Sequence, residues 1–481
     1  MESSKINHIS DFPDKLNPML VKELRQGLRG IGFVVLFIAL QALLAFILLI
    51  TAGAASYENT GHILSRTIFF LFSFAVLIVQ PLRGISALSS EIRGDTIDLL
   101  CLTSLSAWRI TFGKWISLVS QSALILTAVM PYLILRYFFG DMQIFAELIF
   151  LLSIFLASAT LTAFTVGFSA IRSTIIRVLL PIAGGLFMFL YIWRLFVGDR
   201  YFYQEMVQLF SFTSGSSVLG FFAFVLMCIY AGWMCLDIGC TQIAPIAENR
   251  TTLKRTVSLL MIAGALGVAL IANTATSPFL ILGILLCVPI SIISLTENPQ
   301  LVAPIAAPFV RKGVFGKMLG RIFYPGWATG LLFVLLLFSI LQGVLWYSSQ
   351  AQGGIESSHQ LMITSVLAIL VFPVAMTRIL ARKHENRFGI FILFLCTQFL
   401  VISLVHACEQ WSTDLDLMPY FCWIPSTLPI LEARSAFTPE KLQLIAWMSV
   451  GGYALIALAT SLPIWKQIGE TEKQVQSNNE V

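Results

Sequence analysis

Charged residues are scarce in this sequence. Asp, Glu, Lys and Arg make up only 11% of its 481 residues, while 57% of the residues are hydrophobic. Such a chain has too few polar side chains to cover a folded surface in water, so a water-soluble fold is excluded. The formal net charge of +5 is also small, and the basic residues stand in short segments between apolar runs. This distribution provides no extended basic surface, and nucleic acid is therefore a poor candidate partner.

Ionisable residues are also missing from the central parts of the apolar runs. No Asp, Glu, Lys, Arg or His falls in the middle third of any run that is long enough to cross a membrane. Carriers driven by protons or sodium ions usually need such a group near the middle of the membrane, because it binds and releases the coupling ion. This absence argues against ion-coupled transport by the chain.

The sequence has no phosphate-binding loop. The pattern GxxxxGK[ST] requires Ser or Thr after its Gly-Lys pair, but Trp115 follows the first Gly-Lys pair of this chain and Met318 follows the second. No nucleophile, acid and base stand together on one face, which disfavours a membrane-embedded enzyme. We therefore expect no catalytic residues and no cofactor in this chain.

Cysteine and histidine are few and scattered. Most of the eight cysteines lie inside apolar runs, where a thiol behaves as a small hydrophobic group, and none has the spacing of a metal ligand. Cys408 and Cys422 share one expected outer loop, and the sequence leaves open whether they form a disulfide or remain two unrelated thiols. His62, His359 and His406 stand in three different loops, which is more typical of unrelated residues than of a metal site.

Long apolar runs are abundant. Runs of roughly 17 to 25 residues recur along the chain, and in lipid only a helix satisfies its own backbone polar groups over such a length. The sequence therefore predicts an all-α fold, a polytopic transmembrane helical bundle of about twelve spans. The expected spans are residues 31–52, 64–82, 114–137, 144–170, 178–197, 218–240, 256–273, 279–295, 326–347, 360–378, 389–405 and 442–464.

The basic residues predict the orientation of these spans. Lys22, Arg25 and Arg29 precede the first span, and basic loops then follow every second span, so these loops and both termini are expected in the cytosol. Arg66, Arg136 and Arg194 stand at the outer ends of spans, where their long side chains can extend to the membrane interface. The predicted location is the plasma membrane, specifically a bacterial inner membrane.

The loop lengths suggest two halves. Each half has its longest cytosolic loop after its second span and its longest outer loop after its fifth, which is typical of transporters with parallel repeats. The expected organisation is a cytosolic tail with an interfacial helix at 1–30, a first six-span domain at 31–255 containing the loop 83–113, a second six-span domain at 256–465 containing the outer loop 406–441, and a disordered cytosolic tail at 466–481.

A short amphipathic helix is expected before the first span. Asn17 is a suitable N-cap, and Pro18 suits the first turn. One side of this helix is apolar and the other is basic: Leu20, Leu24, Leu28 and Ile31 against Lys22, Arg25 and Arg29. A helix of this kind lies in the membrane interface with its cations among the head groups, and the same pattern is also that of a plain membrane anchor.

Two segments together resemble a known family. The first is the opening formed by Asn17, Pro18, Lys22, Glu23 and Arg25, and the second is the loop after the second span. The second segment contains Glu91, Arg93, Gly94, Asp95, Thr96, Asp98, Leu99, Leu100, Thr103, Leu105, Ser106, Gly113 and Lys114. In order, these residues resemble the permease subunits of ABC-2 type transporters, the ATP-binding-cassette exporter class. The family pattern is an Asn-Pro-x-x-x-Lys-Glu opening, a Glu, a Gly-Thr-Leu-Glu-like step, a Leu-Leu-x-Thr-x-Leu/Pro-Ser stretch and a Gly-Lys at the start of the third span.

This chain departs from the pattern at two positions. Asp95 is inserted between the Gly and Thr of the family's step, and Leu105 stands where a proline is frequent. The resemblance covers roughly the first 240 residues, since the second half shows no equally good match.

The resemblance implies a short helix near 91–102 that docks into a groove on a separate cytosolic ATPase, which would bind ATP and magnesium. Three leucines, at 99, 100 and 102, would fill an apolar cleft, while Glu91, Arg93, Asp95 and Asp98 would make charged contacts at its rim. The alternative is a solvated amphipathic loop. In the same family, segments after the fifth span cap the translocation path, which fits 198–217 and 406–441. The apolar stretch 418–431, interrupted by three prolines, is too short to span and predicts a re-entrant or interfacial segment, or else a loop folded on the outer surface.

The leading hypothesis is thus a membrane permease that works with a separate ATP-binding subunit to move a substrate outward. Either one chain supplies both membrane domains or two copies dimerise. The alternatives are a secondary carrier and a membrane scaffold or assembly protein that transports nothing.

Overall fold

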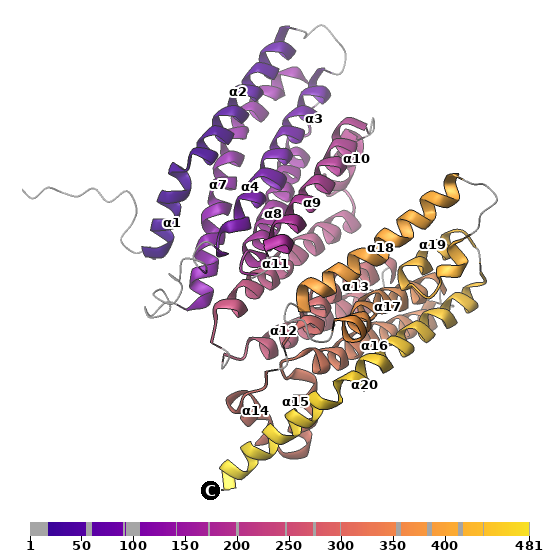
Figure 1. Cartoon of the computed structure of the whole chain (residues 1–481). Coiled ribbons are helices and arrows are strands. Elements are labelled where there is room, and N and C mark those ends of the chain that lie inside the picture. Colours follow the sequence, from indigo (N-terminus) through magenta and orange to yellow (C-terminus); the bar gives the residue numbers. More distant parts are fainter. Residues whose placement is uncertain are drawn as a thin grey trace, which may run out of the picture. The chain divides into compact units, whose positions relative to one another are not determined.

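The computed structural model describes most of the chain as helices joined by short turns (Figure 1). The described residues are 18–53, 60–89, 92, 106–140, 142–171, 174–198, 202–245, 248–272, 276–298, 300–352, 357–381, 387–411, 417–435 and 437–480. No strand occurs in these ranges, and the expectation of an all-α fold is confirmed.

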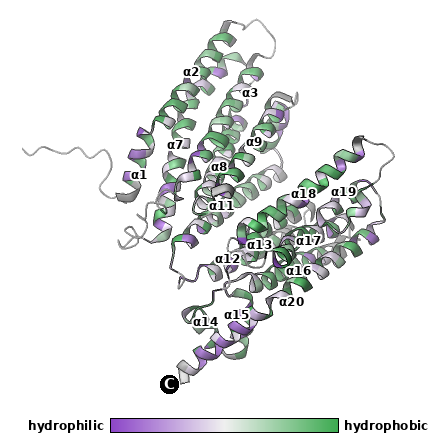
Figure 2. Cartoon of the chain, viewed as in Figure 1, coloured by the Kyte–Doolittle hydropathy of each residue, from purple (hydrophilic) through white to green (hydrophobic). Residues whose placement is uncertain are grey.

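The chain divides into two compact units, Met1–Ala244 and Pro245–Val481. The division expected from the sequence, after residue 255, would cut through helix α12 (Arg250–Ala272). The observed division instead falls in the short segment before this helix. Green apolar residues dominate the helices of both units, and purple hydrophilic residues gather on α1 and on the C-terminal part of α20 (Figure 2).

Unit 1 begins with a short helix and continues with long apolar helices. Its elements are α1 (Pro18–Arg29), α2 (Ile31–Gly53), α3 (Thr60–Ser73), the π-helix η1 (Phe74–Val79), α4 (Gln80–Arg83), η2 (Gly84–Ser86), α7 (Ala107–Arg136), η3 (Tyr137–Phe139), α8 (Ile144–Phe168), α9 (Thr174–Trp193), η4 (Arg194–Gly198), α10 (Phe202–Phe210) and α11 (Gly215–Ile243).

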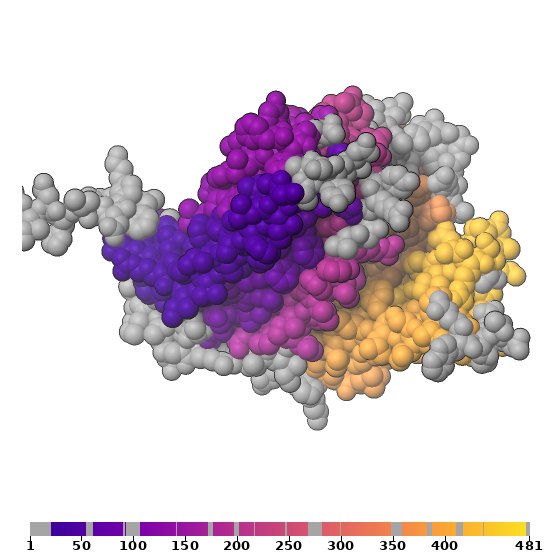
Figure 3. All heavy atoms as spheres, turned by 90° about the horizontal axis from the view of Figure 1, so that it is seen from above, coloured from indigo at the N-terminus to yellow at the C-terminus, as the bar shows by residue number. Residues whose placement is uncertain are grey.

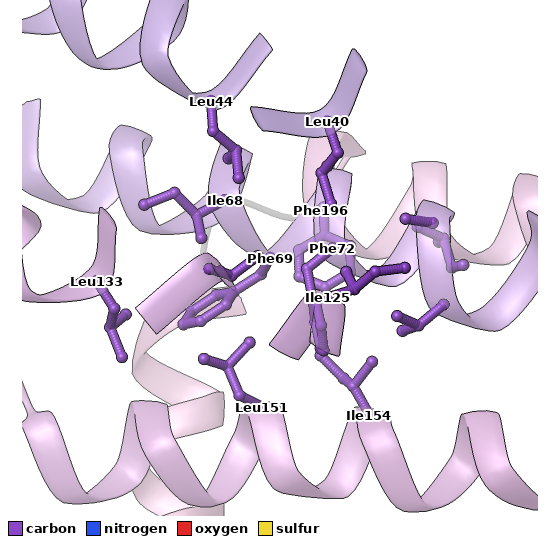
Figure 4. Packing of buried hydrophobic residues seen from close by; sticks show 14 of the residues in the cluster. Leu40, Leu44, Ile68, Phe69, Phe72, Ile125, Leu133, Leu151, Ile154 and Phe196 are labelled. Atoms are coloured by element: carbon purple, nitrogen blue, oxygen red, sulfur yellow. The ribbon is translucent and has the colours of Figure 1, made fainter. Parts of the chain in front are cut away.

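The core of unit 1 is built around two phenylalanines of α3. Phe69 and Phe72 have no exposed surface, and Phe69 packs edge-on against Phe150 of α8 with ring centroids 5.1 Å apart. In Figure 4, Leu44 of α2 approaches this layer from one side and Leu151 of α8 from the other. Figure 3 shows all heavy atoms of unit 1, coloured from indigo to magenta.

Unit 2 is also built of helices and adds a helical hairpin and a series of short helices. Its elements are α12 (Arg250–Ala272), α13 (Thr276–Thr296), α14 (Ala303–Val310), α15 (Gly313–Phe323), α16 (Trp327–Gln352), α17 (Ser357–Leu380), α18 (Arg387–Trp411), η5 (Met418–Phe421), η6 (Pro425–Thr427), α19 (Leu428–Ala433) and α20 (Pro439–Glu480).

Glycines let particular helices approach closely in both units. A Cβ on Gly167 of α8 would overlap the carbonyl oxygen of Cys235 on α11, and a Cβ on Gly330 of α16 would overlap that of Ser294 on α13. Backbone-to-backbone contact of this kind is typical of helices packed in membranes, where association depends on close van der Waals contact.

Ten helices in the described residues are long and apolar enough to cross a membrane, by length and composition. Two expected spans, 256–273 and 279–295, fall on α12 and α13 and are not among these ten; the second contributes the shorter apolar helix Ile281–Thr296. The chain is therefore a multi-pass α-helical membrane protein.

The sequence predicted a disordered C-terminal tail, but the structure has a helix there. Helix α20 continues to Glu480, and Ile468 and Val475 of this extension are almost fully buried in one cluster with Val310 and Tyr324. The prediction was wrong because it weighed only the polarity of the tail. The few apolar residues that the tail does have recur at a helical spacing and face α14.

Cys408 and Cys422, the two cysteines that the sequence allowed as a pair, are both free in the structure.

Candidate functional site

Most of the segment that carries the predicted ATPase contact lies outside the described residues. Its site residues there are Glu91, Arg93, Gly94, Asp95, Thr96, Asp98, Leu99 and Leu100, and Asn17 of the first motif is outside the described residues as well. What the structure describes is the base of this segment: the residues that lead into it, up to Ser89, and those that lead out of it, from Ser106.

The entering chain is fixed to α8. The backbone N–H of Leu88 donates to Ser169 Oγ at 3.0 Å, and the Leu88 side chain is fully buried. A Cβ on Gly84 would overlap the hydroxyl of Thr165, so the turn at the end of α4 lies directly on α8. Ile92, the one described residue inside the segment, donates its N–H to the carbonyl of Leu88 at 3.0 Å.

The leaving chain is fixed by the start of α7. Ser106 is the N-cap of this helix, and its side chain accepts the N–H of Arg109 at 3.4 Å. Ile110 is fully buried in the same apolar cluster as Leu88, together with Val166 of α8 and Leu236 of α11. Both ends of the segment are therefore held by one packed core at the same end of the bundle.

Helix α1 lies against the first turns of α7. Glu23 forms an ion pair with Lys114, with 3.2 Å between Oε1 and Nζ, and Ser117 Oγ donates to the Glu23 carbonyl at 3.0 Å. The two charged side chains are 15% and 8% exposed, so they are only partly screened by solvent. This pair joins the two segments that carry the family resemblance, Glu23 from the opening motif and Lys114 from the Gly-Lys that ends the second.

The remaining residues of the opening motif have other positions. Pro18 is the first residue of α1, and Lys22 and Arg25 are exposed on it. The apolar stripe expected along α1 includes Leu28, which packs against the core of unit 1. A Cβ on Gly27 would overlap the side chain of Gln121, which explains the close approach of α1 to α7.

Arg83 connects the end of α4 to the same site. Its Nη1 donates to Gln80 at 2.9 Å and also to Gln121 of α7. Its guanidinium lies 5.7 Å from the ring centroid of Phe33, at the start of α2. Four elements, α1, α2, α4 and α7, thus meet at the base of the segment, and a displacement of that segment would reach all four through these polar contacts.

Unit 2 contains a second polar site that sequence reasoning missed. Glu297, just beyond α13, pairs with Arg255 of α12 at 2.7 Å and with Lys254 at 3.9 Å. Arg255 is fully buried and also donates to the carbonyl of Ile322 at 2.6 Å, at the end of α15. The signal in the sequence was weak: Glu297 is the one acidic residue in the loop 296–325, opposite a pair of adjacent cations.

The described residues of 406–441, the segment expected to be an outer loop, form the last turns of α18, the short helices η5, η6 and α19, and the start of α20. Glu409 accepts the N–H groups of Leu417 and Met418 at 2.8 and 2.6 Å, and it pairs with Arg434 at 2.6 Å. Met418, Leu428 and Leu431 are fully buried within this part of unit 2. The apolar stretch thus packs onto its own unit through its leucines and methionine.

A buried charge cluster closes the opposite end of unit 1. Arg136 and Glu147 have no exposed side-chain surface and lie 3.7 Å apart, from Nε to Oε1. Arg136 Nε donates to Ser65 Oγ at 2.5 Å, and the Tyr203 hydroxyl donates to Glu147 at 2.8 Å. Burial, together with the hydrogen bond to Glu147, raises the pKa of Tyr203 to about 12. The expectation that Arg136 extends to the membrane interface was wrong, because a buried carboxylate stands one short loop away.

The described residues contain no group of three or more His, Cys, Asp or Glu side chains that could hold a metal ion. Comparison with known proteins adds no assignment: no family model, no curated protein and no solved structure matches this chain.

Proposed function

We propose that this chain is the membrane-spanning subunit of an ATP-binding-cassette transporter of the ABC-2 type, working with a separate ATPase that binds ATP and magnesium. The observation that supports it best is the Glu23–Lys114 pair. Two motifs that are far apart in the sequence, and that resemble the family only when taken together, meet in space at the base of the segment 90–105. A chance resemblance in two unrelated loops would not require such a contact.

The packing at this base supports the same role. When an ATPase closes on ATP, the segment that it contacts must be firmly attached to the membrane helices in order to move them. Here both ends of the segment are held by buried apolar side chains, Leu88 and Ile110, and by the capped start of α7. The contacts of Arg83 with Gln121 and of Glu23 with Lys114 then extend this connection to α4 and α1.

We further propose that one chain supplies both membrane domains. The two units have nearly equal lengths, and each has an ion pair between its elements: Glu23–Lys114 joins α1 to α7 in unit 1, and Arg255–Glu297 joins α12 to the residue after α13 in unit 2. The proposed topology keeps about twelve spans with both termini in the cytosol and a plasma-membrane location. Under this proposal the substrate leaves the cytosol.

A pull-down of the tagged full-length chain from its own membranes in mild detergent tests the function. The wild-type chain should co-purify with an ATPase, detected by ATP hydrolysis and by mass spectrometry. Changing Glu91, Asp95 and Asp98 together to Lys should abolish this, because the proposed rim contacts would reverse in charge. The matched control changes Glu2, Asp11 and Asp14 to Lys, which alters the net charge equally and should keep the ATPase.

Three outcomes separate the hypotheses. An ATPase that is lost only from the first variant supports both the permease role and the contact segment. An ATPase retained by both variants removes that segment from the contact. No ATPase with the wild-type chain, at native expression, would overturn the proposal and favour the secondary carrier or the scaffold; transport that persists after ATP depletion would then identify the carrier.

A further inference from the structure

The helical hairpin of α14 and α15 in unit 2 presents an apolar surface that no other described part of this unit covers. Val314, Phe315 and Met318 of α15 are 78%, 75% and 64% exposed. Exposed apolar residues are expected on spans, which face lipid, but α15 has 11 residues and is too short to span. Its exposed face therefore needs a different explanation.

The exposed apolar residues of α15 and its buried residues lie on opposite sides of the helix. At about 100° per residue, the exposed apolar side chains from Val314 to Leu319 cover an arc of about 140°. Gly316, Gly320 and Phe323 are buried on the opposite side, where a Cβ on Gly316 would overlap the carbonyl oxygen of Phe309 in α14. Lys317 and Arg321 lie on the edge between the buried face and the apolar arc.

The hairpin is strongly basic. Arg311, Lys312, Lys317 and Arg321 belong to it, and residues 298–325 contain no Asp or Glu. Arg321 pairs with Glu472 of α20 at 3.3 Å, and its side chain remains half exposed. Lys312 is exposed at the turn between the two helices. An apolar arc bordered by cations is complementary to a bilayer surface that contains anionic head groups, where each cation contributes by attraction to the surface potential.

The hairpin is also attached to the start of a candidate span, which is where the surface of the bilayer is expected. It connects the end of α13 to the start of α16, a candidate span that begins at Trp327. The buried Arg255 donates to the carbonyl oxygens of Ile322 at 2.6 Å and of Gly326 at 3.2 Å, and Thr252 Oγ1 donates to that of Phe323 at 3.2 Å. The C-terminal end of α15 is thus fixed to the first turns of α12.

We propose that α15 is an interfacial helix that lies in the head-group region of the bilayer, with its apolar arc among the upper acyl chains and Lys312 and Lys317 bound to anionic phospholipid head groups. This proposal does not depend on the ATPase partner. A cytosolic protein that covers the same arc is the competing outcome of the test below.

The test uses the full-length chain with the photoreactive residue p-benzoylphenylalanine in place of Phe315. The purified protein is placed in nanodiscs of phosphatidylcholine mixed with phosphatidylglycerol, irradiated and analysed by mass spectrometry; a second irradiation is done in native membranes. We expect lipid adducts in both, with phosphatidylglycerol enriched over its bulk share. In the K312Q/K317Q background this enrichment should fall roughly tenfold or more, towards the bulk ratio.

The matched control removes the same charge from α20, as K466Q/K473Q, and should leave the enrichment unchanged, because both residues are exposed on a different helix. Size-exclusion chromatography of each variant checks that it is folded. Adducts to a protein in native membranes, or an absence of lipid adducts in nanodiscs, would overturn the proposal. Lipid adducts without any preference for phosphatidylglycerol would overturn its anionic part.

Discussion

Single residues in this protein act mainly through buried charge pairs. The pairs Arg136–Glu147 and Arg255–Glu297 each contain an arginine with no exposed surface. Moving an ion out of water costs free energy. The attraction between the two charges of a buried pair mainly offsets this desolvation cost. Removing one partner therefore leaves the other charge buried without that compensation. In both pairs the arginine makes a further hydrogen bond: Arg136 Nε donates to Ser65 Oγ, and Arg255 Nη1 donates to the carbonyl oxygen of Ile322.

The Arg136–Glu147 pair gives a prediction at this scale. Glu147→Leu should lower the free energy of unfolding in detergent by about 3–5 kcal/mol, because the Arg136 charge stays buried without its carboxylate. Arg136→Met combined with Glu147→Leu should recover much of this loss, since both charges are then gone. Equilibrium denaturation followed by circular dichroism measures the effect. Equal loss in the single and double variants would show that the pair is not coupled.

Single elements were predicted with unequal success. The helix before the first span is present as α1, with Pro18 in its first turn, and its position follows from local signals alone. The prediction of a disordered C-terminal tail was wrong for a different reason. Its helix is stabilised by α14, a segment more than 150 positions earlier in the chain, and local polarity contains no information about such a contact.

Truncation of α20 is the prediction for this scale. Removing 466–481 should destabilise unit 2 by roughly 3 kcal/mol, because Ile468 and Val475 no longer cover Val310 and Tyr324. Removing only 478–481 should have no measurable effect, since the deletion begins beyond Val475. Thermal unfolding of the two purified proteins in the same detergent checks this. A tail that contributes nothing to stability would give the same midpoint for both.

The whole molecule is a chain of apolar helices in two compact units, and its orientation in the membrane is a prediction from charge. In a variant that keeps Cys408 as its sole cysteine, a membrane-impermeant maleimide should label intact cells, because Cys408 is exposed in the structure and outside in the predicted topology. With Lys473→Cys as the sole cysteine, labelling should require permeabilised cells. Labelling of that second variant in intact cells would reverse the topology or change the number of spans.

The amino-acid sequence by itself determined the class of this protein. With few charged residues and long apolar runs, the chain can satisfy its backbone hydrogen bonds in lipid only as an α-helical bundle. The basic loops predict which ends of the helices face the cytosol. The sequence also located the two motifs of the candidate site. Each of these conclusions depends on neighbours within about 25 residues, where composition and spacing hold the information.

Tertiary structure decided which of these residues meet. It joined Glu23 to Lys114, buried Arg136 beside Glu147 and fixed α15 with Arg255. It also left Val314 and Phe315 exposed on a helix too short to span. A hydropathy value describes each of these residues by its own polarity alone. The free-energy cost of burying a charge, however, depends on the partner that packs against it. That partner is determined only when the helices pack together.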